Sequence, residues 1–117
     1  MPLADTPEPP YWAVIFTTLR ADADAGAEGN YDETARRMME LASRQPGFLG
    51  VEHARDAIGI TVSYWANLEA IDAWRRNAEH LAARRLGREL FYRAFRLRVA
   101  RVERARAWCR DSSLSFS

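Results

Sequence analysis

The side chains best suited to acid–base chemistry near neutral pH are the two histidines, because an imidazole titrates between pH 5 and 8. His80 follows Trp74 by six residues, and Trp74 follows Trp65 by nine. A neutral imidazole at His80 could accept a proton from an oxygen of a bound ligand or donate a hydrogen bond to it, and the indoles could stack on an aromatic ring. We expect His53, the other histidine, to lie on the surface of a hairpin.

Each of these residues also has a purely structural interpretation. An aromatic residue on the buried stripe of an amphipathic helix packs in the core, as Trp74 could, and Trp65 at the end of a strand could do the same. A histidine near the C-terminal end of a helix, as His80 is predicted to be, interacts favourably with the helix dipole. For the tryptophans the two interpretations are compatible, because pocket walls are core residues with one face uncovered.

Other aromatic side chains could complete an apolar pocket beside these residues. Phe16 and Trp65 would form its walls, and Tyr92 would donate a hydrogen bond to negative charge that develops on oxygen. Tyr64 is a second candidate donor. We therefore predict that Phe16, Tyr64, Trp65 and Tyr92 bind the substrate and that His80 and Trp74 act in catalysis.

No motif of the sequence predicts a metal ion or a nucleotide cofactor. Two histidines, the single Cys109 and scattered acids show no ligand spacing. Gly26 and Gly29 precede a helix, but the acidic residues around them would repel phosphate. We expect neither a metal nor a cofactor.

Composition limits the class of protein. A chain of 117 residues corresponds to one domain, and a net charge of +1 gives no overall attraction to nucleic acid or anionic membranes. A single cysteine excludes an intrachain disulfide and fits a reducing compartment. No apolar run approaches the ~18 residues of a membrane-spanning helix, and residues 1–10, with their prolines, do not resemble a signal peptide. We expect a cytoplasmic protein.

Hydrophobic patterning predicts the elements that would position these residues. Strands are expected over residues 11–19, 48–54, 58–65 and 92–104, and helices over 31–45 and from Asn67 through 91, the latter with a bend near His80 or Gly87. Asn30 and Asn67 are candidate N-caps, residues 20–29 are expected to be a loop, and Pro46 ends the first helix. The order β-α-β-β-α-β predicts an α+β, ferredoxin-like fold, in which a four-stranded antiparallel sheet carries both helices on one face.

The first predicted strand is apolar on both of its faces, although the helices can cover only one. One face carries Trp12, Val14 and Phe16, and the other carries Tyr11, Ala13 and Ile15. A bare apolar sheet face requires a partner. Two copies that pack sheet against sheet would bury both faces, so we expect a homodimer with C2 symmetry.

The last predicted strand alternates apolar residues with arginines. Phe95, Leu97 and Val99 share one face, and Arg96 and Arg98 share the other. If the apolar face meets the helices, the arginines point to the opposite face, where they could pair with Glu52 across the sheet or the dimer. The alternative is that they bind an anionic group of a ligand.

Two segments, QPGFLGVEHARD (residues 45–56) and ITVSYWANLEAIDAW (residues 60–74), make the sequence similar to the antibiotic biosynthesis monooxygenase family. In that family a helix ends in a Pro-Gly-Phe turn, a strand ends in an aromatic pair, and a Glu-Ala-rich helix carries an aromatic residue and then a histidine. The matching residues here are Pro46-Gly47-Phe48, Tyr64-Trp65, Glu69-Ala70, Trp74 and His80. The similarity covers about residues 11–104, which we take as the domain, between an N-terminal arm (1–10) and a C-terminal tail (105–117).

The resemblance implies a dimeric α+β barrel and a cofactor-independent monooxygenase that oxidises a small aromatic, phenolic or quinol-like compound with O2. The alternative is a non-catalytic dimeric domain that binds or protects a small ligand. The haem-degrading branch of the family needs an Asn on the first strand and a His ten residues after the second Trp. Residues 11–19 contain no Asn, and the residue ten positions after Trp74 is Arg84. We therefore do not expect haem degradation.

Overall fold

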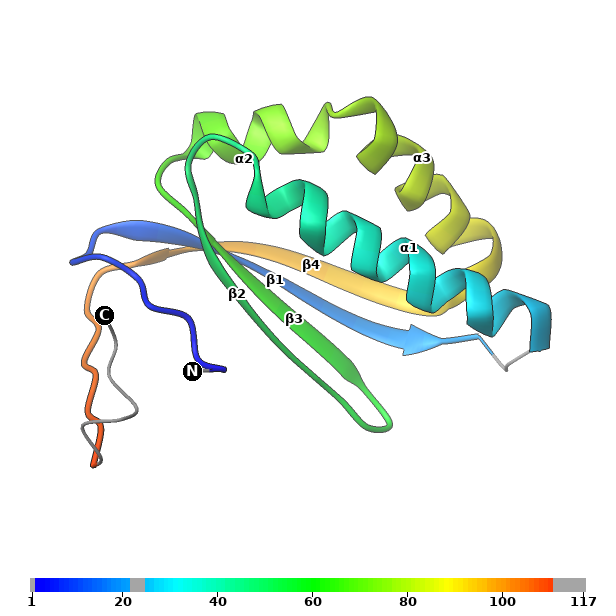
Figure 1. The fold of residues 1–117 in the computed structure, drawn as a ribbon, viewed down its shortest axis with the longest axis horizontal. Helices are drawn as coiled ribbons and strands as arrows, with labels where there is room; N and C mark the ends of the chain where they lie inside the picture. Colours follow the sequence, from blue (N-terminus) through cyan, green and yellow to red (C-terminus); the bar gives the residue numbers. More distant parts are fainter. Residues whose placement is uncertain (1, 22–24, 111–117) are drawn as a thin grey trace.

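Four antiparallel strands form one sheet in the order β2-β3-β1-β4 (Figure 1). The computed structural model describes residues 2–21 and 25–110. The strands are β1 (Tyr11–Arg20), β2 (Phe48–Arg55), β3 (Gly59–Trp65) and β4 (Tyr92–Val102). The helices are α1 (Ala25–Ser43), α2 (Leu68–Arg75) and α3 (Ala78–Leu86), and a π-helical turn, Gly87–Phe91, leads from α3 into β4.

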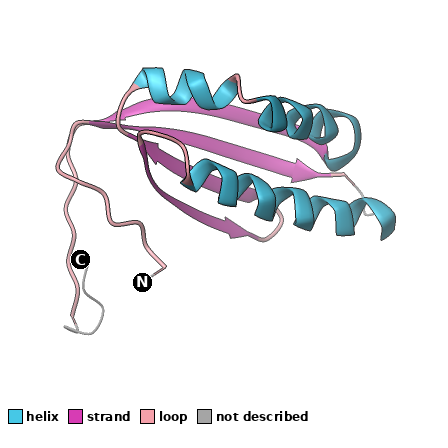
Figure 2. Cartoon of the chain, turned by 45° about the horizontal axis from the view of Figure 1, so that its top comes forward, coloured by secondary structure: helices cyan, strands magenta, loops and turns pink. Residues whose placement is uncertain are grey.

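All three α-helices lie on one face of the sheet (Figures 1 and 2). This arrangement confirms the predicted ferredoxin-like α+β fold, with the second predicted helix divided into α2 and α3. Among the residues that the structure describes, no helix lies on the opposite face of the sheet. None of the described helices is both long and apolar enough to cross a membrane.

The strand register assigns each residue to one face of the sheet. Trp12 of β1 lies opposite Trp65 of β3, and its neighbour Ala13 lies opposite Tyr64. Because successive side chains of a strand point to opposite faces, Trp65 and Tyr64 cannot share one. Trp65 packs under the helices, so Tyr64 belongs to the open face.

The core sits between the helices and the Trp65 end of the sheet. Trp65 is fully buried. The residues around it are Ala42, Ala70 and Ile71, with Trp12, Val14, Phe48 and Trp74 packed against them. Full burial of this indole makes it the largest single apolar contribution to this cluster.

Gly47 fixes the approach of the first helix to the second. Its backbone has a φ of 84°, and a Cβ at this position would lie 2.6 Å from the Cβ of Ala70. Its carbonyl accepts a hydrogen bond from the N–H of Ala66, at 2.8 Å. Both the left-handed backbone and the close contact require glycine, which explains the predicted Pro-Gly turn.

The observed elements differ from the predicted ones at several boundaries. Helix α1 begins at Ala25, so the predictions of a loop through residue 29 and of Asn30 as an N-cap are wrong. A glycine costs only about 1 kcal/mol relative to alanine in a helix, so two glycines in this segment do not exclude a helix. Residues 22–24 of the predicted loop, and 111–117 of the predicted tail, lie outside the described part of the chain.

Strand β4 ends two residues earlier than predicted. Its last residue, Val102, pairs with Tyr11, the first residue of β1. Pro10 precedes Tyr11 and has no N–H to continue the ladder, so pairing stops there. The N-terminal arm and the segment after β4 therefore leave the sheet at the same end (Figure 1).

Candidate functional site

Trp65, Trp74 and His80 form a stack on the helix-covered side of the sheet. The indole of Trp74 lies at 25° to that of Trp65, with their ring centroids 6.3 Å apart. The imidazole of His80 lies nearly parallel to the Trp74 indole, at 11° and with the ring centroids 4.1 Å apart. The structure thus brings together the two predicted catalytic residues and one predicted substrate-binding residue.

Two asparagine caps set the positions of Trp74 and His80. The side chain of Asn67 accepts a hydrogen bond from the N–H of Ala70 at 2.8 Å and starts helix α2, which carries Trp74. The side chain of Asn77 accepts from the N–H of His80 at 3.1 Å and starts α3. The break between the helices turns the chain so that the first turn of α3 places His80 back over Trp74.

The hydrogen bond made by the His80 ring shows which of its two nitrogens carries the proton. Nδ1 lies 2.9 Å from the carbonyl oxygen of Trp74. A carbonyl only accepts, so this contact assigns the proton to Nδ1 and leaves Nε2 as the nitrogen with a lone pair. His80 is therefore oriented as an acceptor of protons through Nε2.

Burial lowers the pKa of the His80 imidazole below its ordinary value. The hydrogen bond to the Trp74 carbonyl acts in the opposite direction, and the nearby charges of Arg84 and Arg75 lower the pKa further. Since the ordinary value is 6.5, the ring is neutral at pH 7. A neutral imidazole is the form required of a general base.

The position of His80 in its helix differs from the predicted one. We expected a histidine near a helix C-terminus, but His80 lies in the first turn of α3. At this end the helix dipole disfavours a positive charge on the ring. Asn77, three residues earlier, is the sequence signal of a new helix start that the prediction missed.

An ion pair joins α3 to α1 next to this histidine. Nε of Arg37 lies 2.7 Å from Oε2 of Glu79, and the pair lowers the pKa of the Glu79 carboxyl. Both side chains are about half exposed, so the pair contributes little to stability. It does hold the first turn of α3 against α1.

Phe16 and Tyr92, the other predicted site residues on this face, lie in a second aromatic cluster. Their rings meet edge to face at 5.6 Å, and Phe95 and Tyr31 join them. Burial raises the pKa of the Tyr92 hydroxyl, which stays protonated as a donor. Of the two residues predicted to form the pocket walls, Trp65 therefore lies in the tryptophan–histidine stack and Phe16 lies in this aromatic cluster.

Between the two groups runs an exposed apolar strip on β4. Val99 pairs with Val14, which packs against the same core cluster as Trp74, and Leu97 pairs with Phe16. Val99 and Leu97 remain about half exposed although they face the helix side. The strip connects the stack with the aromatic cluster along one strand.

Tyr64 is the predicted site residue that the structure separates from the others. Its hydroxyl donates to Oε1 of Glu52 at 2.6 Å, and its ring contacts Tyr11 on the open face. Burial raises the pKa of this hydroxyl. The prediction that Tyr64 and Trp65 line one pocket is wrong, because adjacent strand residues point to opposite faces.

Arg96 and Arg98 lie on the open face, as expected when the apolar side of β4 faces the helices. Within the chain, the predicted pairing with Glu52 is absent. Its carboxylate instead accepts from the Tyr64 hydroxyl and from the N–H of Ala4. His53, as predicted, is exposed.

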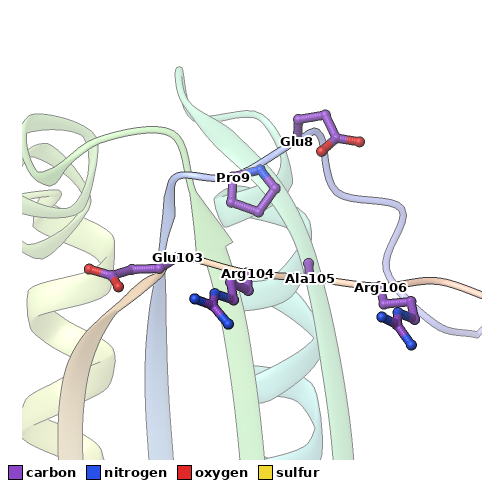
Figure 3. A pocket seen from close by; sticks show the side chains of 6 residues that line it. All are labelled: Glu8, Pro9, Glu103, Arg104, Ala105 and Arg106. Atoms are coloured by element: carbon purple, nitrogen blue, oxygen red, sulfur yellow. The ribbon is translucent and has the colours of Figure 1, made fainter.

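A pocket lies where the chain enters β1 and leaves β4 (Figure 3). Its lining residues are Glu8, Pro9, Glu103, Arg104, Ala105 and Arg106. None of them is aromatic, and none is a predicted site residue. Over residues 2–21 and 25–110, no three His, Cys, Asp or Glu side chains converge as metal ligands would.

Comparison with known proteins adds independent information. Residues 14–86 match the model of the antibiotic biosynthesis monooxygenase family. The uncharacterised protein YqjZ of Bacillus subtilis (strain 168) is 52% identical over 106 residues, which cover 89% of this chain and 90% of YqjZ.

Solved structures share the fold. Rv0793 from Mycobacterium tuberculosis superposes with a TM-score of 0.68 at 18% identity, over 82% of this chain and 99% of its own. SnoaB, a cofactor-independent oxygenase from Streptomyces nogalater, gives a TM-score of 0.65 at 16% identity, over 88% of this chain and 100% of its own. At these identities the likeness extends to the fold alone.

Proposed function

Since the chain belongs to the antibiotic biosynthesis monooxygenase family, we propose that it is a cofactor-independent monooxygenase that oxidises a small phenolic or quinol-like aromatic compound with O2. The observation that carries the proposal is the His80 ring, which is stacked on Trp74 and bonded through Nδ1. This arrangement supplies an oriented base beside an aromatic surface. SnoaB, which shares the fold, is a cofactor-independent oxygenase.

The proposed reaction begins with proton transfer. Nε2 of His80 takes the hydroxyl proton of the substrate, and the resulting anion passes one electron to O2. The substrate radical and superoxide then combine at carbon to form a hydroperoxide, after protonation. Loss of water leaves a carbonyl, so one oxygen atom enters the product and the other leaves as water. The substrate itself supplies all four electrons that O2 accepts, and the carbon that becomes the carbonyl gives up its hydrogen to the water.

The residues around His80 have distinct proposed roles. Trp74 holds the His80 imidazole parallel to its own ring, and Trp65 packs against Trp74. The exposed strip of Leu97 and Val99 is the apolar surface on which the rest of the substrate would lie. Apolar surroundings favour the chemistry because a dry environment strengthens the interactions of the developing charge.

The proposed assembly is a homodimer through the open face of the sheet, a dimeric α+β barrel. Ile15, Ile60 and Leu19 lie on this face, and Ile60 and Leu19 are exposed. Glu52 and Arg98 occupy the two edge strands of the same face. In a sheet-to-sheet dimer with its two-fold axis along the strands, the β2 edge of one copy would lie opposite the β4 edge of the other. The Glu52 carboxylate of each copy would then face an Arg98 guanidinium across the interface. The proposed location is the cytoplasm, which the single cysteine favours.

Oxygen consumption with a panel of hydroquinones and polycyclic phenols tests the proposed activity. The purified protein is incubated with and without O2, and product absorbance is followed together with O2 uptake. His80→Ala should lower turnover by about 10²–10⁴-fold, the usual effect of losing a general base. The matched control is His53→Ala, which removes an exposed histidine and should leave turnover unchanged.

The same assay identifies the alternative, a non-catalytic binding domain. In that case no O2 is consumed with any member of the panel, while the compounds still quench tryptophan fluorescence through Trp65 and Trp74. His80→Ala would then leave binding nearly intact. This result would contradict the monooxygenase proposal.

A further inference from the structure

A group of basic and hydroxyl side chains surrounds Tyr31 at the end of the sheet where β1 ends. The guanidinium carbon of Arg20 lies 4.1 Å from the centre of the Tyr31 ring, and that of Arg55 lies 5.6 Å from it. Nη2 of Arg55 donates to Oγ1 of Thr18 at 2.7 Å and to the Tyr31 hydroxyl at 3.2 Å. Two cations therefore converge on one aromatic ring from different strands.

The structure makes room for the Arg55 head by means of a glycine. Gly59 pairs with both Arg55 and Thr18 on the neighbouring strands. A Cβ on Gly59 would collide with the Arg55 guanidinium and would lie 2.8 Å from Oγ1 of Thr18. Thr18 is itself buried. The guanidinium thus occupies a place that only glycine at this position leaves open.

No carboxylate neutralises this pair of arginines among the side chains that the structure describes. No described Asp or Glu lies within ion-pair distance of Arg20 or Arg55, and the Arg20 guanidinium donates no hydrogen bond to a described group. Both guanidinium groups lie against the Tyr31 ring, so an anion that binds beside this ring would be attracted by both charges. A guanidinium fork with unused N–H groups matches the geometry of a carboxylate.

The surroundings of the arginines are aromatic. Thr18, which holds Arg55, pairs directly with Phe95 on β4, and the Phe95 ring is 47% exposed. Phe95 touches Phe16 and Tyr92, and Tyr92 touches Tyr31. An exposed aromatic surface therefore continues from the charged group. A ligand with a carboxylate on an aromatic ring would match both features at once.

We propose that Arg20, Arg55 and Tyr31 form a binding site for the carboxylate of a small aromatic acid, whose ring lies toward Phe95. Arg55 is fixed by Thr18 and Tyr31 and offers its remaining N–H groups to one carboxylate oxygen. Arg20, held on the face of Tyr31, binds the other. The site depends on neither His80 nor O2, so it can exist whether or not the chain is an oxygenase.

Titration with benzoate, followed by the arginine Nε–Hε signals in 1H–15N NMR spectra at low ionic strength, tests the site. The Arg20 and Arg55 signals should shift saturably with benzoate, more weakly with acetate, and not with benzyl alcohol, which lacks the charge. Arg20→Gln and Arg55→Gln should each weaken benzoate binding about 10-fold or more. The matched control Arg76→Gln removes an exposed arginine elsewhere and should bind benzoate as the unaltered protein does.

Gly59→Ala provides a variant that leaves every charge in place. It should displace the Arg55 head and weaken benzoate binding, while thermal unfolding shows that the protein remains folded. Equal binding of benzoate, acetate and benzyl alcohol would overturn the proposal, as would an equal loss in Arg76→Gln. It would also be overturned if benzoate binds only after Asp22, Asp24 and Glu28 are changed to their amides, because the counter-ion would then come from the chain itself.

Discussion

The imidazole of His80 lies parallel to the indole of Trp74 at 4.1 Å, and its Nδ1 lies 2.9 Å from the carbonyl oxygen of the same tryptophan. One residue thus both supports the ring of the proposed base and fixes its tautomer. The two contacts require the break between α2 and α3, because an uninterrupted helix would place residues six apart on different sides.

The pH dependence of turnover should follow the lowered pKa of His80. The imidazole accepts a proton only when neutral, so activity should be constant near pH 7 and fall as the pH drops through a midpoint below 6.5. Arg84→Gln removes a charge that lowers this pKa, so it should move the midpoint toward higher pH. The measurement is kcat/KM against pH. An acid limb centred above 6.5 in the unaltered protein would contradict the assignment.

The two asparagine caps should be separable by mutation. Asn77→Ala and Asn67→Ala each remove a side-chain acceptor from a helix start and should each lower the free energy of unfolding by about 1 kcal/mol. Only Asn77→Ala should also raise the pKa of His80 toward 6.5, because a frayed first turn of α3 exposes the ring. Urea denaturation and NMR titration of the imidazole measure the two effects. Equal histidine titration in both variants would show that the Asn77 cap does not position the ring.

Tyr64→Phe should leave turnover unchanged, although its neighbour Trp65 belongs to the stack. Its hydroxyl faces the open side and donates to Glu52, and burial keeps its pKa raised so that it stays protonated. Loss of this hydrogen bond should lower the free energy of unfolding by about 1 kcal/mol. Steady-state kinetics and chemical denaturation provide the comparison. A large fall in kcat would mean that the open face takes part in the reaction.

Ile60→Asp should weaken the proposed dimer about 10-fold or more, because it places a charge in a buried apolar interface. Ile60 is 44% exposed and points to the open face of the sheet. Ile58, which lies in the hairpin turn and is 48% exposed, gives the matched control Ile58→Asp. Analytical ultracentrifugation over a range of concentrations measures the dissociation constant. A monomer in the unaltered protein, or equal weakening in both variants, would exclude this face as the interface.

Local rules predicted most of the fold. The apolar pattern of residues 11–19 predicted a strand, and β1 lies between β3 and β4 in the sheet; alternation in residues 95–99 predicted that Phe95, Leu97 and Val99 share one face of β4, as they do. Gly47 and Asn67 marked a turn and a cap that the structure confirms. The family resemblance is confirmed as well. These features depend on residues close together in the chain, where spacing alone determines direction.

The sequence did not predict contacts between residues that are far apart along the chain. Spacing gave Trp65, Trp74 and His80 as candidates, but their stacking depends on how α2 and α3 pack on β3. Tyr64 was misplaced because the sequence gives the alternation of a strand without showing which side the helices cover. Arg20, Tyr31 and Arg55 come from three elements and share no motif, so only the tertiary structure brings them together. Packing among non-local residues decides such sites, because the energy of a contact depends on three-dimensional proximity and not on order along the chain.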